Sequence, residues 1–371
     1  MDPSIKITQC YRTFFPESQG GLEQVVLEIA RGTTSRVLTL SNSGYTKGEY
    51  RNVQFLAARR WFTVASCCIG PGLIKLIYKD LADLLHFHYP WPFGDVVYCL
   101  AGRSRPLVIT YHSDIVRQRT LGALYKPLMR RFFNKADRIV ATSENYVKSS
   151  DVLSEFQHKI EIIPLGIDEH GYPCPSQVLQ SRVRERYGRN FMLFVGVLRY
   201  YKGLEFLVRA AVGQGYQVVI AGKGPEWRRL HSLAEQLGAA NVHFTGFVDE
   251  EEKMALMRLC RAVVLPSHLR SEAFGVTLIE GLMSAKPLIS CEIGTGTSFV
   301  NVDGETGHVV PPANPAALRE AMNDLWLNPD KAERMGWAGR QRYEKLFTGE
   351  RMAAAYRKLY DEVLSERGLA R

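Results

Sequence analysis

The sequence predicts an α/β protein with two Rossmann-like, doubly wound domains that face a central cleft. The chain has 371 residues, which is too long for one ordinary hydrophobic core. Its second half alternates short apolar runs with helical patterns of about ten residues, as the strands and helices of a parallel sheet do. Residues 164–177 (PLGIDEHGYPCPSQ) are rich in Pro and Gly and have no periodicity, which indicates a linker. Ligands of such sheets bind beyond the carboxyl ends of strands, so the loops that follow strands are the first places to search for a site.

Short apolar runs mark the strands, and amphipathic runs mark the helices between them. In the first half, the expected strands are residues 36–40, 84–87, 107–110 and 138–142. In the second half, they are residues 191–197, 217–221, 242–244, 262–265 and 287–290. Helices are expected over residues 204–212, 225–237 and 274–285, and the acidic run 249–252 opens a further helix.

Composition excludes several classes of protein. No apolar run reaches the roughly 20 residues that a membrane span needs, and the N-terminus lacks the pattern of a signal peptide. The seven cysteines are scattered without C-x-x-C spacing, which favours buried free thiols in a reducing cytosol over disulfides or a metal site. The net charge of +9 fits a phosphorylated ligand, anionic lipid or nucleic acid, but the sequence contains no nucleic-acid-binding motif. It contains no D-x-D motif either, so no bound metal and no cofactor are expected.

The segment SEAFGVTLIEG holds two carboxylates in apolar surroundings. A helix that starts near Phe274 exposes the N–H groups of Gly275 and Val276, which attract an anion such as phosphate. Glu280 lies on the same face as Val276 and can accept two hydrogen bonds from a ribose diol. Glu272 lies just before the helix and is better placed for hydroxyl groups beyond the phosphates. The alternative is that Glu272 complements the helix dipole and Glu280 is solvated or ion-paired.

Together with its surroundings, this segment resembles the E-x7-E motif of retaining family-4 glycosyltransferases, which have the GT-B fold. The resemblance covers residues 266–290 (PSHLRSEAFGVTLIEGLMSAKPLIS) and 305–315 (ETGHVVPPANP), and the order of motifs fits nearly the whole chain. It implies that Glu272 contacts the donor sugar and Glu280 holds the nucleotide ribose. It also implies an acceptor-binding domain over residues 1–170, completed by a helix at about 350–371, and a nucleotide-sugar-binding domain over 171–349.

The loop GVLRYYKG places two cations, Arg199 and Lys202, after an expected strand. They can neutralise a diphosphate leaving group, or they are ordinary surface cations. The family places its arginine directly after the first glycine, where this chain has Val197. Lys202 therefore matches the family pattern, whereas Arg199 is displaced from it.

Two further loops of the second half resemble those that flank the nucleotide base in this family. The loop AGKGP contributes Gly222, and FTGFVDEEE contributes Phe247 and Val248. The glycines of GKGP are too few for a dinucleotide fingerprint, which disfavours a nicotinamide dehydrogenase.

The first half offers two more matches. Gly20 and Gly21 precede an apolar helix and either form a tight turn or let a ligand approach the backbone. In the family this Gly-Gly pair faces the donor phosphates. His112 in LVITYHSD follows an apolar strand, and the family has a histidine there close to the reacting sugar. A structural histidine is the alternative.

Residues 115–135 combine cations with bulky apolar residues. Such a basic amphipathic helix can lie on anionic lipid, or it can pack its apolar side on the sheet and leave the cations outside. The cations are Arg117, Arg119, Lys126, Arg130, Arg131 and Lys135.

The sequence thus predicts a retaining, sugar-nucleotide-dependent hexosyltransferase. The segments YHSD, LRYYKGL and CEIGTGTSFVN most resemble those of bacterial enzymes that build lipopolysaccharide O-chains from GDP-mannose or GDP-rhamnose. The resemblance implies a nucleotide-sugar donor, a lipid-linked glycan acceptor and a cytoplasmic protein held peripherally at the inner face of the cell membrane. The alternatives are a UDP-sugar-dependent enzyme of the same fold and a non-catalytic nucleotide-sugar or nucleic-acid-binding protein.

Overall fold

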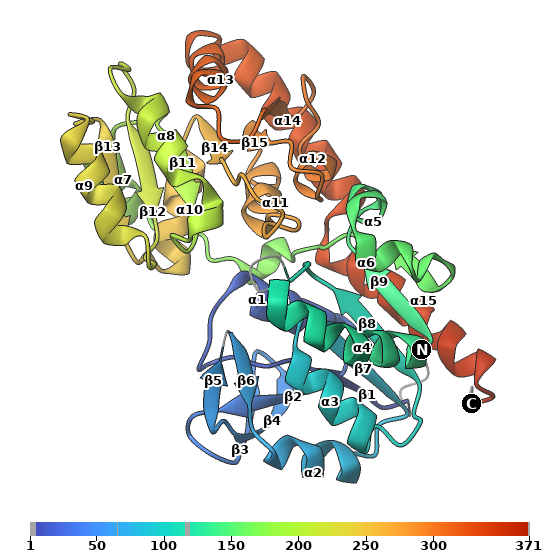
Figure 1. Cartoon of the computed structure of the whole chain (residues 1–371). Helices are drawn as coiled ribbons and strands as arrows, with labels where there is room; N and C mark the ends of the chain where they lie inside the picture. The colour runs from blue at the N-terminus through green and yellow to red at the C-terminus, as the bar shows by residue number, and fades with distance from the viewer. Residues whose placement is uncertain (1–4, 65, 116–118, 370–371) are drawn as a thin grey trace. The chain divides into compact units, whose positions relative to one another are not determined.

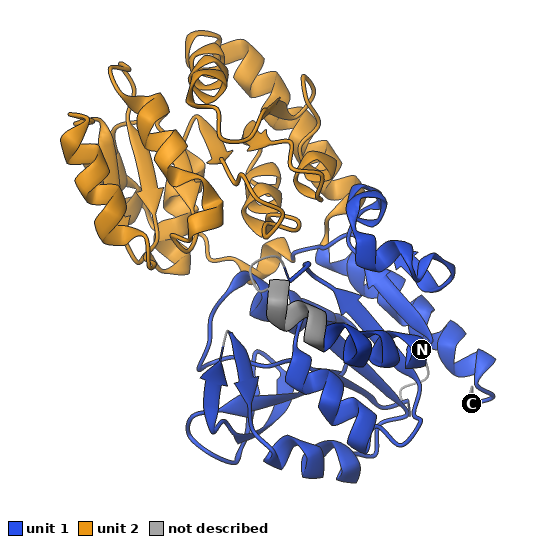
Figure 2. Ribbon diagram, in the orientation of Figure 1, with its two compact units in different colours: residues 1–167, 349–371 blue, residues 168–348 orange. Residues whose placement is uncertain are grey.

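The computed structural model describes residues 5–64, 66–115 and 119–369, and only the backbone of residues 119–124. The chain forms two compact units (Figures 1 and 2): unit 1 comprises residues 1–167 and 349–371, and unit 2 comprises residues 168–348. The domain boundary was expected between residues 170 and 171. The structure places it between residues 167 and 168, inside the Pro- and Gly-rich segment. The expected α/β class with two Rossmann-like domains is confirmed.

Unit 1 is built on an eight-stranded sheet with the order β10-β9-β8-β7-β1-β2-β4-β3. All neighbours are parallel except β3 and β4, which are antiparallel. The strands are β1 (Ile7–Cys10), β2 (Arg36–Ser41), β3 (Thr46–Tyr50), β4 (Val53–Arg59), β7 (Leu84–Tyr89), β8 (Leu107–Tyr111), β9 (Arg138–Ala141) and β10 (Ile160–Ile162). A separate antiparallel hairpin pairs β5 (Phe62–Val64) with β6 (Cys67–Ile69). The order of strands reverses at β1, which places the ligand-binding position of a doubly wound sheet beyond β1 and β7.

The helices of unit 1 form two layers, which can be followed in Figure 1. α1 (Gly21–Gly32) packs against α15 (Gly349–Glu366), and α3 (Pro92–Ala101) packs against both α2 (Gly72–Lys79) and α4 (Arg119–Lys135). Two short helices, α5 (Glu144–Ser149) and α6 (Asp151–Ser154), follow β9. The contact between α1 and α15 is close, because a methyl group added at Gly32 would lie 2.2 Å from the Cβ atom of Ala353. α15 is therefore an integral part of unit 1.

Unit 2 contains a six-stranded parallel sheet with the order β13-β12-β11-β14-β15-β16. Its strands are β11 (Met192–Val195), β12 (Val218–Ala221), β13 (Val242–Gly246), β14 (Ala262–Leu265), β15 (Leu288–Cys291) and β16 (Gly307–Val310). The central strands are short, continuous apolar runs that are buried throughout, as expected for parallel strands covered on both faces. The order reverses between β11 and β14, so the loops after these two strands are neighbours.

Helices cover both faces of this sheet. α8 packs against α9 and α13, α7 packs against α10, and α11 packs against α14. The helices are α7 (Gln177–Tyr187), α8 (Leu204–Ala211), α9 (Trp227–Gln236), α10 (Glu250–Leu259), α11 (Val276–Met283), α12 (Thr297–Val300), α13 (Pro315–Leu327) and α14 (Pro329–Leu346). Within the described part of the chain, no helix is long and apolar enough to cross a bilayer.

Candidate active site

The loops that follow β11 and β14 contact each other at the point where the strand order of unit 2 reverses. Gly203 ends the first loop with a φ of +66°, and a side chain there would place its Cβ atom 2.0 Å from the carbonyl oxygen of Pro266. The N–H of His268 donates to the carbonyl of Tyr201 at 3.0 Å. Glycine at 203 therefore permits a close contact that fixes one loop against the other.

This contact brings Lys202 and Glu272 together, although they lie 70 residues apart in the sequence. The ammonium of Lys202 donates to Oε2 of Glu272, and the Ser267 hydroxyl donates to the same oxygen at 3.0 Å. Glu272 is 8% exposed. Burial lowers the pKa of Lys202, but the nearby carboxylate of Glu272 outweighs it and raises that pKa above the usual 10.5. Lys202 is thus a charged lysine in a nearly dry site, while Oε1 of Glu272 has no hydrogen-bond partner among the described residues.

Glu280 has a second, similar set of partners. Its Oε1 accepts hydrogen bonds from Lys253 at 2.6 Å and from the Tyr172 hydroxyl at 3.0 Å. Glu280 is 5% exposed and Lys253 is 9% exposed. Burial lowers the pKa of Lys253, but Glu280 and Glu250 raise it above 10.5. Again one carboxylate oxygen is occupied, and Oε2 remains without a partner among the described residues.

Sequence reasoning missed Lys253 and Tyr172. Lys253 follows the acidic start of α10, where it reads as one more exposed charge. It does, however, lie four residues before the buried Met257, on the apolar side of that helix. A lysine at an apolar helical position is the signal that was available in the sequence. Tyr172 belongs to the segment that was interpreted only as a linker.

The N-terminus of α11 lies between the two glutamates in sequence. The helix begins at Val276 rather than near Phe274, and Gly275 precedes it with φ +82° and ψ +74°. No described residue accepts a hydrogen bond from the backbone N–H of Val276 or Thr277. The Thr277 hydroxyl donates to the carbonyl of Val195 at 3.2 Å, which ties this end of the helix to the end of β11. Two free N–H groups and the positive end of the helix dipole are suited to a phosphate.

The other predicted residues of unit 2 differ in their surroundings. The side chain of Phe274 is 3% exposed and packs against Phe299 and Phe347, so only its backbone can face a ligand. Arg199 is exposed at the surface, close in sequence to the half-buried Lys202. The N–H of Gly222 donates to the carbonyl of Gly246 at 2.8 Å, so the loops after β12 and β13 lie together. Phe247 follows that pair and is 68% exposed, and Val248 is half-buried.

In unit 1, Gly20 and Gly21 form the start of α1, with Gly20 extended (φ −154°) as its N-cap. His112 follows β8 and is 3% exposed. Burial and the nearby Arg12 guanidinium lower the pKa of His112 to about 3, so the ring is neutral at pH 7. Its Nε2 lies 2.9 Å from Nδ1 of His88, and its Nδ1 is buried with no hydrogen-bond partner among the described residues. Gly20 begins a helix after β1 and His112 follows β8, so both lie at the carboxyl ends of strands.

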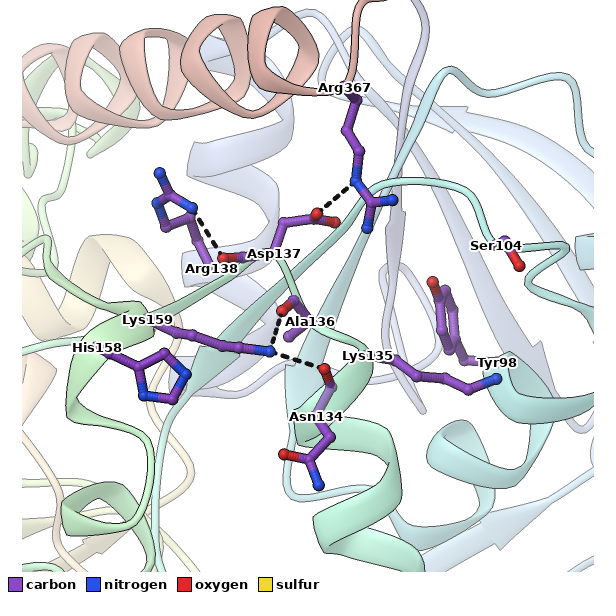
Figure 3. A pocket seen from close by; sticks show the side chains of 10 residues that line it. All are labelled: Tyr98, Ser104, Asn134, Lys135, Ala136, Asp137, Arg138, His158, Lys159 and Arg367. Carbon is purple, nitrogen blue, oxygen red and sulfur yellow. Dashed lines mark hydrogen bonds and ion pairs between the residues drawn. The ribbon is translucent and has the colours of Figure 1, made fainter.

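A cavity of about 510 Å³ lies at the opposite, amino ends of β8 to β10 (Figure 3). Lys159 donates there to the carbonyls of Asn134 and Ala136, both at 2.7 Å, and Arg367 donates to Asp137 at 2.6 Å. These cations complete the C-terminus of α4 and neutralise a carboxylate. The cavity contains none of the predicted site residues. No group of three or more His, Cys, Asp or Glu side chains in the described ranges is arranged to hold a metal ion.

Residues 119–135 of the basic segment 115–135 form α4. Met129, Phe132 and Phe133 are buried, so the apolar side of the helix packs into the core. Lys126 and Arg130 pair with Glu155, at 3.4 and 2.7 Å. Arg131 and Lys135 are exposed, whereas Arg117 and the side chain of Arg119 lie outside the described residues. α4 therefore offers exposed cations but not an exposed apolar stripe over its described side chains.

Comparison with known proteins identifies the family. The model of glycosyltransferase family 4 matches residues 19–170, and that of glycosyl transferases group 1 matches residues 178–342. The D-rhamnosyltransferase WbpZ of Pseudomonas aeruginosa is 47% identical over 353 residues, which are 93% of this chain and 92% of the relative. The O-antigen chain mannosyltransferase C of Escherichia coli is 43% identical over 371 residues, which are 98% of this chain and 100% of the relative.

Solved structures agree on the fold. Sucrose-phosphate synthase from Thermosynechococcus elongatus superposes with a TM-score of 0.81 at 20% identity, over 98% of this chain and 100% of that one. WaaG, a glycosyltransferase involved in lipopolysaccharide biosynthesis, superposes with a TM-score of 0.69 at 16% identity, over 94% and 98%. These similarities confirm the expected GT-B class of fold. The chain therefore belongs to the group 1, family 4 glycosyltransferases and is a hexosyltransferase.

Proposed function

We propose that this enzyme transfers mannose or rhamnose from a GDP-sugar, with retention of configuration, onto a lipid-linked glycan during O-antigen synthesis. The names of the two relatives at 47% and 43% identity support this class of sugar and this pathway. The observation that carries the proposal is the pair of buried glutamates flanking the free N-terminus of α11. In each glutamate, one carboxylate oxygen accepts hydrogen bonds from protein groups, and the other is available to a ligand.

In this proposal the two glutamates have different ligands. Oε2 of Glu280 accepts hydrogen bonds from the ribose diol. The N–H groups of Val276 and Thr277 receive the diphosphate. The ammonium of Lys202 donates to Glu272 and also to the diphosphate. Its interaction with the diphosphate strengthens as the negative charge of that group grows during cleavage of the glycosidic bond. Oε1 of Glu272 accepts from hydroxyl groups of the donor sugar.

A donor panel tests the proposal. GDP-mannose, GDP-rhamnose and UDP-glucose are supplied with a lipid-linked acceptor, and the released nucleoside diphosphate and the product are measured. The proposal expects turnover with one of the GDP-sugars. Turnover with UDP-glucose alone would instead support the alternative, a UDP-sugar-dependent enzyme of the same fold. The configuration of the new linkage, read by NMR of the product, tests retention.

The Glu272→Gln variant separates catalysis from simple binding. The amide keeps the size of the side chain and loses the charge that pairs with Lys202. A catalyst then loses turnover, while the variant, although less stable because Lys202 loses its charged partner, stays folded and still binds nucleotide. Binding of sugar nucleotide by the parent without any turnover would instead favour the non-catalytic alternative.

We also propose that transfer requires no metal, because Lys202 and the N-terminus of α11 supply positive charge for the diphosphate. Turnover should then persist in excess EDTA. Loss of turnover in EDTA and its recovery on addition of Mg²⁺ would contradict this part of the proposal.

We further propose peripheral contact of unit 1 with the anionic inner face of the cell membrane, where a lipid-linked acceptor and a cytoplasmic donor can meet. Besides Arg131 and Lys135, the β5–β6 hairpin supports it. Trp61, Phe62 and Val64 are 65%, 50% and 56% exposed, and aromatic residues of this kind partition into the bilayer interface.

Vesicle flotation tests this contact. Trp61→Ser combined with Phe62→Ser should reduce co-flotation with phosphatidylglycerol vesicles, whereas Leu327→Ser, an equally exposed apolar residue of unit 2, should not. Arg131→Glu with Lys135→Glu should weaken binding mainly at low salt, since each interfacial cation contributes about 1 kcal/mol and salt screens it. A parent protein that ignores the vesicles at low salt would contradict the contact.

A further inference from the structure

Unit 1 contains a continuous network of buried polar side chains that crosses its sheet. Every member is at most 5% exposed, and the members come from β1, β7, β8 and the residue after it, the turn between α1 and β2, and the C-terminal helix α15. They are Gln9, Thr33, Ser35, His86, His88, Thr110, His112, Tyr356 and Tyr360. Because buried polar atoms must be paired, the hydrogen atoms of this network can be placed by counting.

The count starts at the carbonyl oxygen of Ile29, which can only accept. The hydroxyl of Thr33 lies 2.7 Å from it and therefore donates to it. Thr33 has no second hydrogen, so in the 2.9 Å contact between Thr33 and Ser35 the donor is Ser35. Ser35 has then used its hydrogen as well. Its oxygen must accept from the third member, Gln9, at 3.0 Å.

This requirement sets the orientation of the Gln9 amide. Its nitrogen faces Ser35 and also donates to the Tyr360 hydroxyl at 3.1 Å. Its oxygen faces Nε2 of His88 at 3.0 Å. An amide oxygen cannot donate, so Nε2 of His88 carries a hydrogen.

The histidine pair continues the chain. Burial, together with the neighbouring His86 and His112, holds the pKa of His88 well below 6.5, so its ring is neutral and its Nδ1 is bare. Nδ1 of His88 lies 2.9 Å from Nε2 of His112, and the two rings are stacked with centroids 5.2 Å apart. The hydrogen of this contact must then belong to Nε2 of His112. A neutral His112 has its other nitrogen, Nδ1, bare.

The second branch of the network agrees with this direction. Tyr360 accepts from Gln9, so its own hydrogen goes to Nδ1 of His86 at 2.7 Å. Nε2 of His86 donates to Thr110 at 2.7 Å, and Thr110 donates to Tyr356 at 2.7 Å. Each hydrogen is used once. The reverse direction would require the Gln9 oxygen to face Tyr360 and Ser35, and no hydrogen would then lie between Gln9 and Ser35.

We infer that Gln9 and His88 are positioning residues that hold His112 in one tautomer, so that its buried Nδ1 is an obligatory hydrogen-bond acceptor for a hydroxyl group of the substrate. This inference rests on the proposed function for the identity of that substrate. A bare ring nitrogen accepts from a sugar hydroxyl but is repelled by the oxygens of a phosphate, which have no hydrogen at neutral pH. His112 thus selects the sugar and not the diphosphate.

Nitrogen-15 NMR of histidine-labelled full-length protein tests the tautomer, because protonated and bare ring nitrogens have well separated shifts. The signals of His112 are identified by their loss in His112→Asn. The expected spectrum at pH 7 shows a protonated Nε2 and a bare Nδ1. A protonated Nδ1 on His112 would overturn the inference whatever the substrate is.

Two variants test the chain of positioning. Gln9→Leu removes the acceptor of His88, so both rings should show averaged nitrogen signals, and kcat/KM should fall about tenfold. Thr110→Val breaks only the His86 branch of the same network. It should leave the signals of His112 unchanged and kcat/KM within about twofold of the parent. Equal changes in the two variants would mean that the network is merely structural.

A titration identifies the group that His112 accepts from. The proposed GDP-sugar should shift the Nδ1 signal of His112, and GDP alone should not. An equal shift with GDP would overturn the choice of a sugar hydroxyl. If the tautomer is as expected but no GDP-sugar is turned over, the proposed donor fails while the assignment of Gln9 and His88 stands.

Discussion

The ion pair between Lys253 and Glu280 leads to a measurable prediction for Lys253→Met. The substitution keeps most of the unbranched apolar stem and removes the charged end from a pair with a 2.6 Å separation. Glu280 is 5% exposed and, among the described residues, retains only the Tyr172 hydroxyl as a donor. Breaking a buried pair from one side typically costs about 3–5 kcal/mol, because the remaining charge is left uncompensated. That is a large share of the roughly 5–15 kcal/mol by which domains are stable.

The double variant Lys253→Met with Glu280→Gln provides the matched control. The neutral amide still accepts from Tyr172 and no longer requires a cation, so most of the lost stability should return. The folded pKa of Lys253 lies above 10.5, so its contribution is complete at pH 7 and is lost only as the pH rises through that folded value. Measurements at pH 7 therefore report the intact pair.

Native-state hydrogen exchange of the peptides covering α10 and α11 provides the assay, because it reports the opening free energy of unit 2 separately from unit 1. A loss of less than about 1 kcal/mol in Lys253→Met would match an exposed pair and would refute the argument from burial. A double variant no more stable than the single variant would show that packing of the lysine stem, and not its charge, was responsible.

Three other predictions concern the ligand and pH. Glu280→Gln should weaken binding of the nucleoside diphosphate by about 1–3 kcal/mol in calorimetry, because a charge-assisted bond to the ribose is replaced by a neutral one; equal affinity would argue against this role. Lys202→Ala should lower kcat more than it raises KM, and a change in KM alone would make Lys202 a binding residue only. His86, His88 and His112 all have folded pKa values below 6.5, so unfolded chains bind more protons as the pH falls below 6.5. Urea unfolding should therefore show stability falling by up to roughly 4 kcal/mol per pH unit, and a flat profile between pH 6.5 and 5 would contradict the burial of neutral histidines.

The sequence predicted most clearly the central strands that are continuous apolar runs, and it missed several other strands. Residues 262–265 were expected as a strand and form β14 with the same bounds. β1 was missed because Thr8 and Gln9 interrupt its apolar pattern, although both are fully buried. Gln9 is satisfied there by Tyr360, 351 residues away, and no local pattern reports such a partner. β3 was missed because it is an edge strand with a polar sequence.

Partners that are distant in the sequence also limit what could be predicted of the site. The spacing of Glu272, Gly275 and Glu280 is local, so a helix with a free N-terminus between two carboxylates could be predicted. The ion-pair partners of the glutamates could not, because Lys202 and Lys253 reach them from 70 and 27 residues away in the sequence. Pairing depends on which strand ends are neighbours in the sheet, and strand order is not encoded in local periodicity.

The position of α15 has a consequence for how the chain folds during synthesis. This helix supplies Tyr356 and Tyr360 to the buried network of unit 1, yet the ribosome produces it only after the whole of unit 2. Until then, the face of α1 that receives α15 is uncovered. The unit that is translated first is therefore completed last, because unit 1 stays open until α15 has left the ribosome.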